Sequence, residues 1–122
     1  MNVSDRFFFK KKFRLLKKKD FKRVFNTSQK NVTSLLISFN VNNKLSYPRL
    51  GIIISKKISK SAVKRNLIKR IIRESFRIAQ YYLLNLDFII LVKSNIIKIH
   101  RLALKKFLNN FWMRYINNVS NI

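Results

Sequence analysis

The stretch from Ser61 to about Leu83 has the strongest periodicity in the chain, and it predicts a long amphipathic helix. Its apolar residues recur at the spacing of one helix face: Ile68, Ile71, Ile72, Ala79, Tyr82 and Leu83. Most of the stability of such a helix comes from packing this face against another element. The rest of the chain must therefore supply a surface that buries this face.

That surface is predicted to be a β-sheet. Residues from Thr33 to Val41 alternate between two faces, one of them more apolar, as in a strand. A β-branched run marks a second strand from Arg49 to Lys57, and the turn residues of 42–48 could conceal a very short one. Asp87 to Lys93 is apolar throughout its middle, which is typical of a strand covered on both faces.

Two further helices are expected, one before and one after these strands. Residues from Lys18 to roughly Thr27 carry an acid suited to the first turn, Asp20, and three apolar residues on one face: Phe21, Val24 and Phe25. Leu102 to about Ile116 is helical by the same criterion. The order is helix, two or three strands, helix, strand, helix. This predicts an α+β fold with a mixed sheet.

The chain has 122 residues, which favours a single domain spanning 1–122. Residues 1–13 are basic and aromatic without clear periodicity, so they are either a frayed terminus or a flexible arm that orders on RNA. With 28 Lys and Arg against 4 Asp and Glu, the net charge is +24. A compact state with this charge calls for an anionic partner: nucleic acid, a membrane surface or an acidic protein.

Several classes of protein are excluded. The absence of Cys removes disulfide frameworks and thiolate zinc sites, and a single glycine, Gly51, removes glycine-rich phosphate loops. The longest apolar run, Phe88 to Val92, is far too short to cross a bilayer. We expect no signal peptide at the N-terminus and a cytoplasmic protein.

A catalytic site made of protein side chains is poorly supported. The four acids, Asp5, Asp20, Glu74 and Asp87, are scattered, whereas acid–base chemistry usually needs paired carboxylates or a partnered His. Glu74 stands among three arginines and is expected to form ion pairs. His100 has no second ligand for a metal. We therefore expect no catalytic or metal-binding residues.

The central helix predicts nucleic-acid binding instead. Arg65, Lys69, Arg73 and Arg77 follow one another at four-residue steps, so successive side chains drift by only about 40° and form a slanted ridge. The neighbouring residues add cations and one amide: Lys56, Lys57, Lys60, Lys64, Asn66 and Arg70. A merely solvated face would mix both signs, yet Glu74 is the only acid between Asp20 and Asp87. We favour phosphate contact.

A second group of residues combines aromatics with cations. Phe21 and Phe25 are interleaved with Lys17, Lys18, Lys22 and Arg23, and Phe39 is expected opposite them. Rings that stack on bases beside cations suit single-stranded nucleic acid. Periodicity alone allows the other interpretation, that both Phe residues belong to the core.

These motifs together resemble the bacterial ribonuclease P protein. The likeness rests on the strand Arg49-Leu-Gly-Ile-Ile-Ile-Ser-Lys-Lys57, the helix Arg65-Asn-Leu-Ile-Lys-Arg-Ile-Ile-Arg-Glu74, the upstream segment 14–25 and the strand 87–93. It covers roughly residues 10–116. The resemblance implies a two-layer α/β sandwich of order αβββαβα, with a four-stranded mixed sheet and a left-handed β-α-β crossover, like the second domain of a ribosomal protein.

The resemblance also implies a function: the family's protein binds a catalytic RNA, and the pair removes the 5′ leader of precursor tRNA with Mg²⁺ held by the RNA. A monomeric protein would bind the RNA one to one. The motif implies catalytic-RNA contacts by Lys56, Lys57, Lys64, Arg65, Asn66, Lys69, Arg70 and Arg73, and leader contacts by Lys17, Phe21, Phe25 and Phe39. Leu67 stands where the motif usually has Arg, so one contact is lost or moved to Lys64 or Lys69.

Three alternatives remain open on the sequence. A ribosomal or general RNA-binding protein of similar fold would share the charge but would need neither the paired aromatics nor the helix motif. A membrane-surface protein would need an amphipathic helix that the Phe7-Phe8-Phe9-Lys10 segment does not make. An autonomous nuclease is disfavoured because the acids are not paired.

Overall fold

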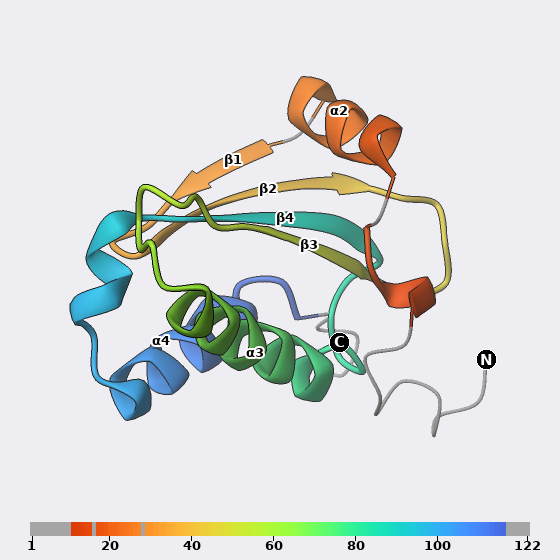
Figure 1. The fold of residues 1–122 in the computed structure, drawn as a ribbon. Helices are drawn as coiled ribbons and strands as arrows, with labels where there is room; N and C mark the ends of the chain where they lie inside the picture. Colours follow the sequence, from red (N-terminus) through yellow and green to blue (C-terminus); the bar gives the residue numbers. More distant parts are fainter. Residues whose placement is uncertain (1–10, 16, 28, 117–122) are drawn as a thin grey trace.

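A computed structural model describes residues 11–15, 17–27 and 29–116, and the elements within them follow the predicted order (Figure 1). The helices and strands are α2 (Lys18–Thr27), β1 (Gln29–Val32), β2 (Leu36–Asn42), β3 (Arg49–Ile53), α3 (Ala62–Ala79), β4 (Leu86–Val92) and α4 (Arg101–Met113). Two short 3-10 helices, η1 (Lys11–Phe13) and η2 (Ser94–Lys98), precede α2 and α4. None of the described helices is long and apolar enough to cross a membrane.

The four strands form one mixed sheet in the order β1-β2-β4-β3. β1 pairs with β2 and β2 with β4 in antiparallel fashion, whereas β3 runs parallel to β4. The parallel neighbours β3 and β4 are connected through α3, which makes the β-α-β crossover of the expected fold. The predicted α+β architecture with a mixed four-stranded sheet is confirmed.

The additional strand is β1, which precedes the two predicted early strands. The prediction that a short strand is hidden in 42–48 is therefore wrong. β1 has the sequence Gln-Lys-Asn-Val and lies largely exposed at the sheet edge, so it carries no apolar alternation. The next strand starts at Leu36 rather than Thr33, because Thr33 begins the tight hairpin turn and its hydroxyl donates to the Leu36 carbonyl at 2.6 Å. Residues 43–48 form a turn in which Lys44 has φ of 58°.

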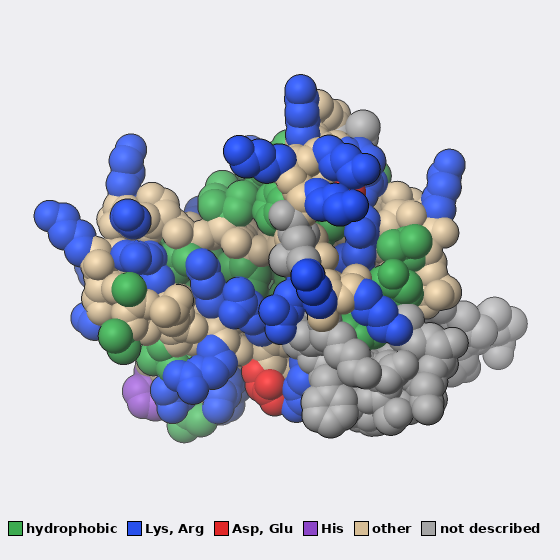
Figure 2. Space-filling model, turned by 45° about the vertical axis from the view of Figure 1, so that its right-hand side comes forward, with side chains coloured by type: hydrophobic (Ala, Val, Ile, Leu, Met, Phe, Trp, Pro, Cys, Tyr) green, Lys and Arg blue, Asp and Glu red, His purple; other side chains and the backbone are tan. Residues whose placement is uncertain are grey.

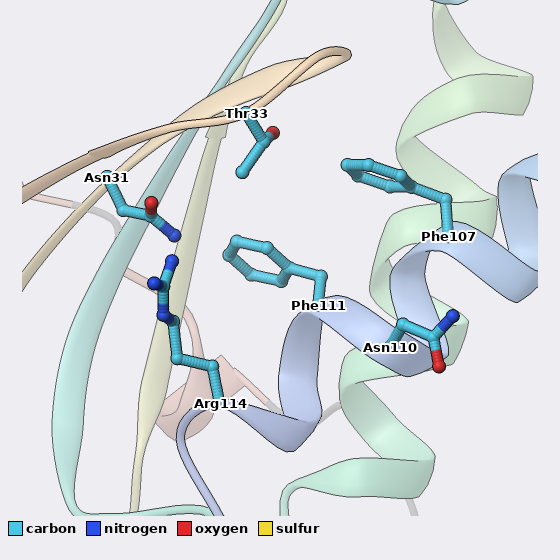
Figure 3. A pocket seen from close by; sticks show the side chains of 6 residues that line it. All are labelled: Asn31, Thr33, Phe107, Asn110, Phe111 and Arg114. Carbon is cyan, nitrogen blue, oxygen red and sulfur yellow. The ribbon is translucent and has the colours of Figure 1, made fainter.

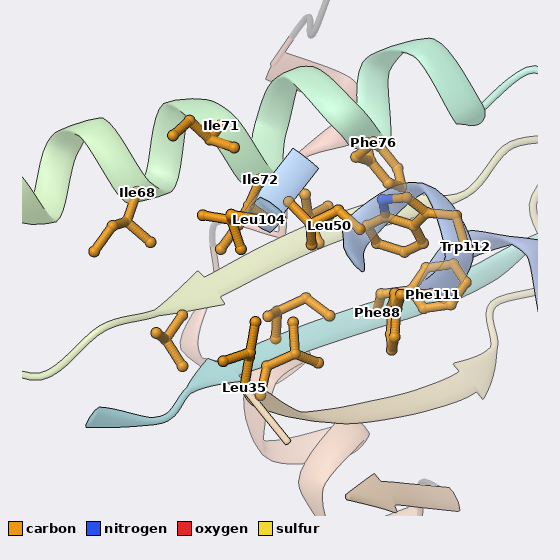
Figure 4. Packing of buried hydrophobic residues seen from close by; sticks show 14 of the residues in the cluster. Leu35, Leu50, Ile68, Ile71, Ile72, Phe76, Phe88, Leu104, Phe111 and Trp112 are labelled. Atoms are coloured by element: carbon orange, nitrogen blue, oxygen red, sulfur yellow. The ribbon is translucent and has the colours of Figure 1, made fainter. Parts of the chain in front are cut away.

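α3 and α4 pack side by side against one face of the sheet and enclose the main core (Figure 4). The Ser61 hydroxyl caps α3 by accepting from the Lys64 amide at 3.2 Å. As predicted, Ile68, Ile71 and Ile72 are buried. The helix ends at Ala79, however, and of the predicted residues beyond it Tyr82 is 61% exposed, whereas Leu83 is buried in the main core outside the helix.

α2 lies on the opposite face of the sheet and covers part of it (Figure 1). Val24 of α2 is buried with Leu15 and Ile89. The single glycine permits this packing, because a Cβ on Gly51 of β3 would lie 2.6 Å from the Phe21 ring.

The N-terminal segment enters the fold before α2. Of the expected arm, the structure describes residues 11–13, which form η1, and residues 1–10 lie outside the described part. The Phe13 side chain is fully buried in the main core and its ring packs edge-on against Tyr47 at 5.2 Å between centroids. η1 therefore anchors the N-terminal segment to the main core.

Candidate nucleic-acid interface

The cationic ridge of α3 runs from the edge of the buried stripe out into solvent. At 100° per residue, Arg65 and Lys69 flank the buried face and are half-buried, whereas Arg73 faces outward and is exposed. Arg65 also has a local role, because its guanidinium donates to the Ser59 carbonyl at 2.5 Å and holds the loop before the helix. The predicted ridge is therefore presented on the surface, with its first member partly engaged.

A hollow of about 510 Å³ lies beside the ridge at Arg73. Asn66, Arg70, Arg73 and Glu74 of α3 line it together with Arg14, which reaches it from the segment before α2. Burial and then the nearby charge of Arg14 lower the pKa of Arg73. The positive charges of these arginines repel one another, so a bound anion would stabilise them, and a phosphate group fits that requirement.

Arg14 is a candidate contact that the sequence reasoning did not single out. It is placed by an isolated bridge to Leu50 of β3, and the next residue, Leu15, donates its amide to the Leu50 carbonyl at 3.0 Å. This pairing joins segments 36 residues apart (50 − 14), so no local pattern predicts it.

Glu74 forms the ion pair expected for it. The Arg77 Nε donates to a Glu74 carboxylate oxygen at 3.1 Å, and this bond holds the pKa of Glu74 below its usual range. Arg77 is thus engaged by the single acid of the ridge. Glu74 also lines the hollow beside Arg73, although its printed ion pair is with Arg77.

Lys56 and Lys57 lie exposed in the loop between β3 and α3. The loop folds on its own serines, since the Ser55 hydroxyl accepts from the Lys57 amide at 3.0 Å. Lys64 is exposed in the first turn of α3. Lys64 thus lies at the positive end of the helix dipole, where anions are favoured.

Leu67, at the position where the motif usually has Arg, packs half-buried against the main core. It separates the Arg70 hollow from an apolar crevice that it shares with Ile97 and Ile99. Leu67 thus contributes aliphatic packing, and the cations that line the same crevice are Lys64 and Arg101.

The second predicted group of residues lies on the α2 face of the sheet. The Phe25 and Phe39 rings meet edge-on at 4.8 Å between centroids, and Phe25 is 41% exposed. Phe21 is half-buried against Gly51, and Lys17 at the start of α2 is exposed. The two interpretations were core packing and base stacking. Phe21 packs in the core and is partly exposed, whereas Phe25 lies at the surface.

An apolar row continues this surface beyond α2. The register aligns Val32, Ile37, Leu91 and Ile53 across the four strands. Val32 is 57% exposed and the other three are half-buried. Apolar side chains rimmed by blue Lys and Arg side chains are visible next to α2 in Figure 2. Such a surface can stack unpaired bases while its rim binds phosphates.

A buried carboxylate fixes α2 over this face. Asp87 of β4 is fully buried and accepts from Arg49 Nε at 2.8 Å, from Arg49 Nη2 at 2.7 Å and from Asn43 at 3.0 Å. Arg23 of α2 completes the cluster through a short ion pair to Asp87. Burial acts to raise the pKa of Asp87, but the hydrogen bonds from Arg49, Asn43 and Arg23 outweigh it and the pKa is lowered. In the sequence, this cluster is marked only by an isolated acid, Asp87.

The described residues contain no group of three or more metal-ligating side chains. His100 caps α4 instead, its ring nitrogen accepting from the Leu102 amide at 3.2 Å.

Comparison with known proteins decides the family. A family model described as Ribonuclease P matches residues 9–116. The chain belongs to the ribonuclease P protein family. It is 44% identical over 110 residues to the ribonuclease P protein component of Buchnera aphidicola from Acyrthosiphon pisum, covering 89% of this chain and 96% of the relative. For the protein of Pasteurella multocida the identity is 43% over 108 residues, with 88% and 91% covered.

Solved structures of ribonuclease P proteins have the same fold. The Staphylococcus aureus RNase P protein superposes with a TM-score of 0.80 at 29% identity, covering 86% of this chain and 98% of that one. The resemblance inferred from the motifs on β3, α3, α2 and β4 is confirmed. The role of each site residue stays a prediction.

Proposed function

We propose that this protein is the subunit of ribonuclease P that binds the catalytic RNA through α3 and the 5′ leader of precursor tRNA through the α2 face. The observation that carries the proposal is the presence of two different RNA-compatible surfaces on opposite faces of one small sheet, in a chain of this family (Figure 1). One is a ridge of cations, and the other is an aromatic and apolar face.

The α3 surface acts through charge. Lys56, Lys57 and Lys64 at the helix start, and Arg65, Asn66, Lys69, Arg70 and Arg73 along it, contact phosphates of the catalytic RNA. Arg14 joins them across the hollow. If six to ten phosphates are bound, affinity falls by roughly 10³–10⁵ between 50 and 200 mM salt.

The α2 surface acts through stacking. Leader bases lie against Phe25 and Phe39, with Phe21 supporting them from the core side and Lys17 binding the backbone. Because mature tRNA lacks the leader, contacts on this face favour precursor over product. Asp87 keeps α2 in the position that forms the surface.

The cleavage chemistry belongs to the RNA, with Mg²⁺ held there, and takes place in the cytoplasm. The protein lowers the Mg²⁺ requirement because its cations relieve repulsion between the two RNAs. A monomeric protein bound one to one with the catalytic RNA is sufficient for these contacts.

Two substitutions separate the two surfaces in binding assays. Arg73→Ala should lower affinity for a bacterial ribonuclease P RNA about tenfold, since hydrogen bonds to charged groups contribute about 1.5–3 kcal/mol. Phe25→Ala should lower affinity of the protein–RNA complex for leader-bearing precursor tRNA by about fivefold or more, with mature tRNA unaffected.

Matched controls remove the same side-chain types elsewhere. Lys106→Ala takes an exposed cation from α4, and Tyr82→Ala takes an exposed aromatic from beyond α3. Each should change binding by less than twofold. Equal losses for both RNAs in Arg73→Ala and Phe25→Ala would contradict the assignment of the two surfaces.

A further inference from the structure

A third hollow lies between the sheet edge and α4, away from both surfaces described above (Figure 3). Its volume is about 340 Å³, and it is lined by Asn31 and Thr33 of the β1 side and by Phe107, Phe111 and Arg114 from α4 and its C-terminal cap. A neighbouring hollow of about 330 Å³ shares Asn31 and Arg114 and extends along β1 to Gln29 and Lys30. Together they form a groove along the outer strand, here called the β1–α4 groove.

The walls of the groove combine flat apolar and polar groups. Figure 3 shows the rings of Phe107 and Phe111 and the Thr33 side chain turned toward the space, with Asn31 and Arg114 across from the rings. Phe111 is 7% exposed and closes the floor, whereas Phe107 is half-buried and offers part of its ring. The Thr33 hydroxyl is used in the hairpin turn, so the groove receives its methyl group.

The polar groups are held in place but not exhausted. Asn31 donates through its amide nitrogen to the Tyr115 hydroxyl at 3.3 Å, and Ser38 also contacts that hydroxyl at 3.3 Å. Its amide oxygen has no hydrogen bond within the described chain and can accept one from a ligand. Arg114 is exposed at the C-terminal cap of α4, with no carboxylate partner among the described residues.

The charge of the groove selects an anionic ligand. Both segments that build it are free of acids, since no Asp or Glu occurs in 21–73 or in 88–122. Lys30 and Arg114 supply cations at positions along the groove. A ring wall, an amide acceptor and an arginine in one hollow match the base, the base edge and the phosphate of an unpaired nucleotide.

We propose that the β1–α4 groove binds one or two nucleotides of single-stranded RNA, with a base against Phe107 and a phosphate at Arg114. This inference rests on the proposed function only in that RNA is the partner. The nucleotides come either from the catalytic RNA or from the precursor tRNA, and the two sources share this chemistry.

The test uses the full-length protein and two variants, each of which neutralises one cation of α4 or its C-terminal cap. Arg114→Gln alters the groove, and Lys106→Gln removes an exposed cation of α4 outside it. Affinity for a single-stranded RNA hexamer, measured by fluorescence anisotropy, should fall roughly tenfold more in Arg114→Gln than in Lys106→Gln. Equal losses would overturn the proposal, and unchanged thermal melting of both variants excludes a folding defect.

A second variant tests the base contact independently of charge. Phe107→Leu removes the ring and keeps an apolar side chain, so an RNA hexamer carrying 2-aminopurine should lose the part of its protein-dependent quenching that arises in the groove, while the part that arises on the α2 face is kept. Quenching equal to that of the unsubstituted protein would contradict stacking at this ring. Concentration-dependent dimerisation that is abolished by Arg114→Gln, without any change in RNA affinity, would assign the groove to strand addition at β1 and refute RNA binding.

Separate assays identify the RNA that supplies the nucleotides and test the proposed function. Affinities of Arg114→Gln for catalytic RNA alone, and of its complex for precursor tRNA, show which RNA occupies the groove, because only one should weaken. If the protein fails to stimulate cleavage while the hexamer result holds, the proposed function falls and the groove stands. If cleavage is stimulated and the hexamer result fails, the reverse follows.

Discussion

Replacement of Asp87 by Asn should destabilise the protein and weaken leader binding, although Asp87 itself does not contact the RNA. Removing one partner of a buried ion pair costs about 3–5 kcal/mol. Here the Arg23 side chain is 38% exposed and can turn to water, and Asn can still accept one hydrogen bond, so we expect about 2–3 kcal/mol. Most of this loss arises from Arg49, whose side chain is only 20% exposed.

Asp20→Asn provides the matched control. Asp20 lies in the first turn of α2 with a carboxylate oxygen 3.8 Å from Arg49, a loose contact at a partly exposed site. Its removal should cost less than about 1 kcal/mol. Urea unfolding followed by the fluorescence of the buried Trp112 measures both free energies of unfolding in one assay.

The pH dependence of this difference is a second check. The folded pKa of Asp87 is lowered, so its contribution is fully present above the unfolded value of about 3.9 and is lost as pH falls through the folded pKa. The unsubstituted protein and Asp87→Asn should therefore differ most near neutral pH and converge in acid. A cost no greater than that of Asp20→Asn, or a difference independent of pH, would refute the reasoning.

Three further outcomes are expected. Gly51→Ala should cost about 1–3 kcal/mol in urea unfolding, because its Cβ would press against the Phe21 ring at 2.6 Å, and binding of catalytic RNA should be retained. Glu74→Gln should change stability by less than about 1 kcal/mol, since this pair is largely exposed, yet tighten catalytic-RNA binding about two- to fivefold in filter binding by removing the acid beside Arg77. Arg73→Ala should reduce the slope of log affinity against log salt by about one in a salt titration.

The sequence predicts the elements whose side chains repeat with a clear period. α2 spans the residues expected for it, and the bounds of α3 and β4 differ from the expected ones by a few residues, because burial of one face imposes the pattern. β1 is not predicted by such a period. As an exposed edge strand it needs only the hydrogen bonds of β2, so its sequence carries no apolar alternation.

The candidate site divides in the same way. The ridge on α3 is local in sequence, so its cations can be counted at four-residue steps. Arg14 reaches the same hollow through a bridge to β3, and the Asp87 cluster joins β4, β3 and α2. Such contacts are properties of the tertiary fold, and single residues distant in the chain give no periodic sign of them.

Leader release from precursor tRNA by a bacterial ribonuclease P RNA at limiting Mg²⁺, with and without this protein, tests the central claim most directly. We expect the protein to restore cleavage at Mg²⁺ concentrations where the RNA alone is slow, and no cleavage by the protein alone. Unchanged RNA cleavage in the presence of the protein would contradict the account, and cleavage without the RNA would assign the chemistry to the protein.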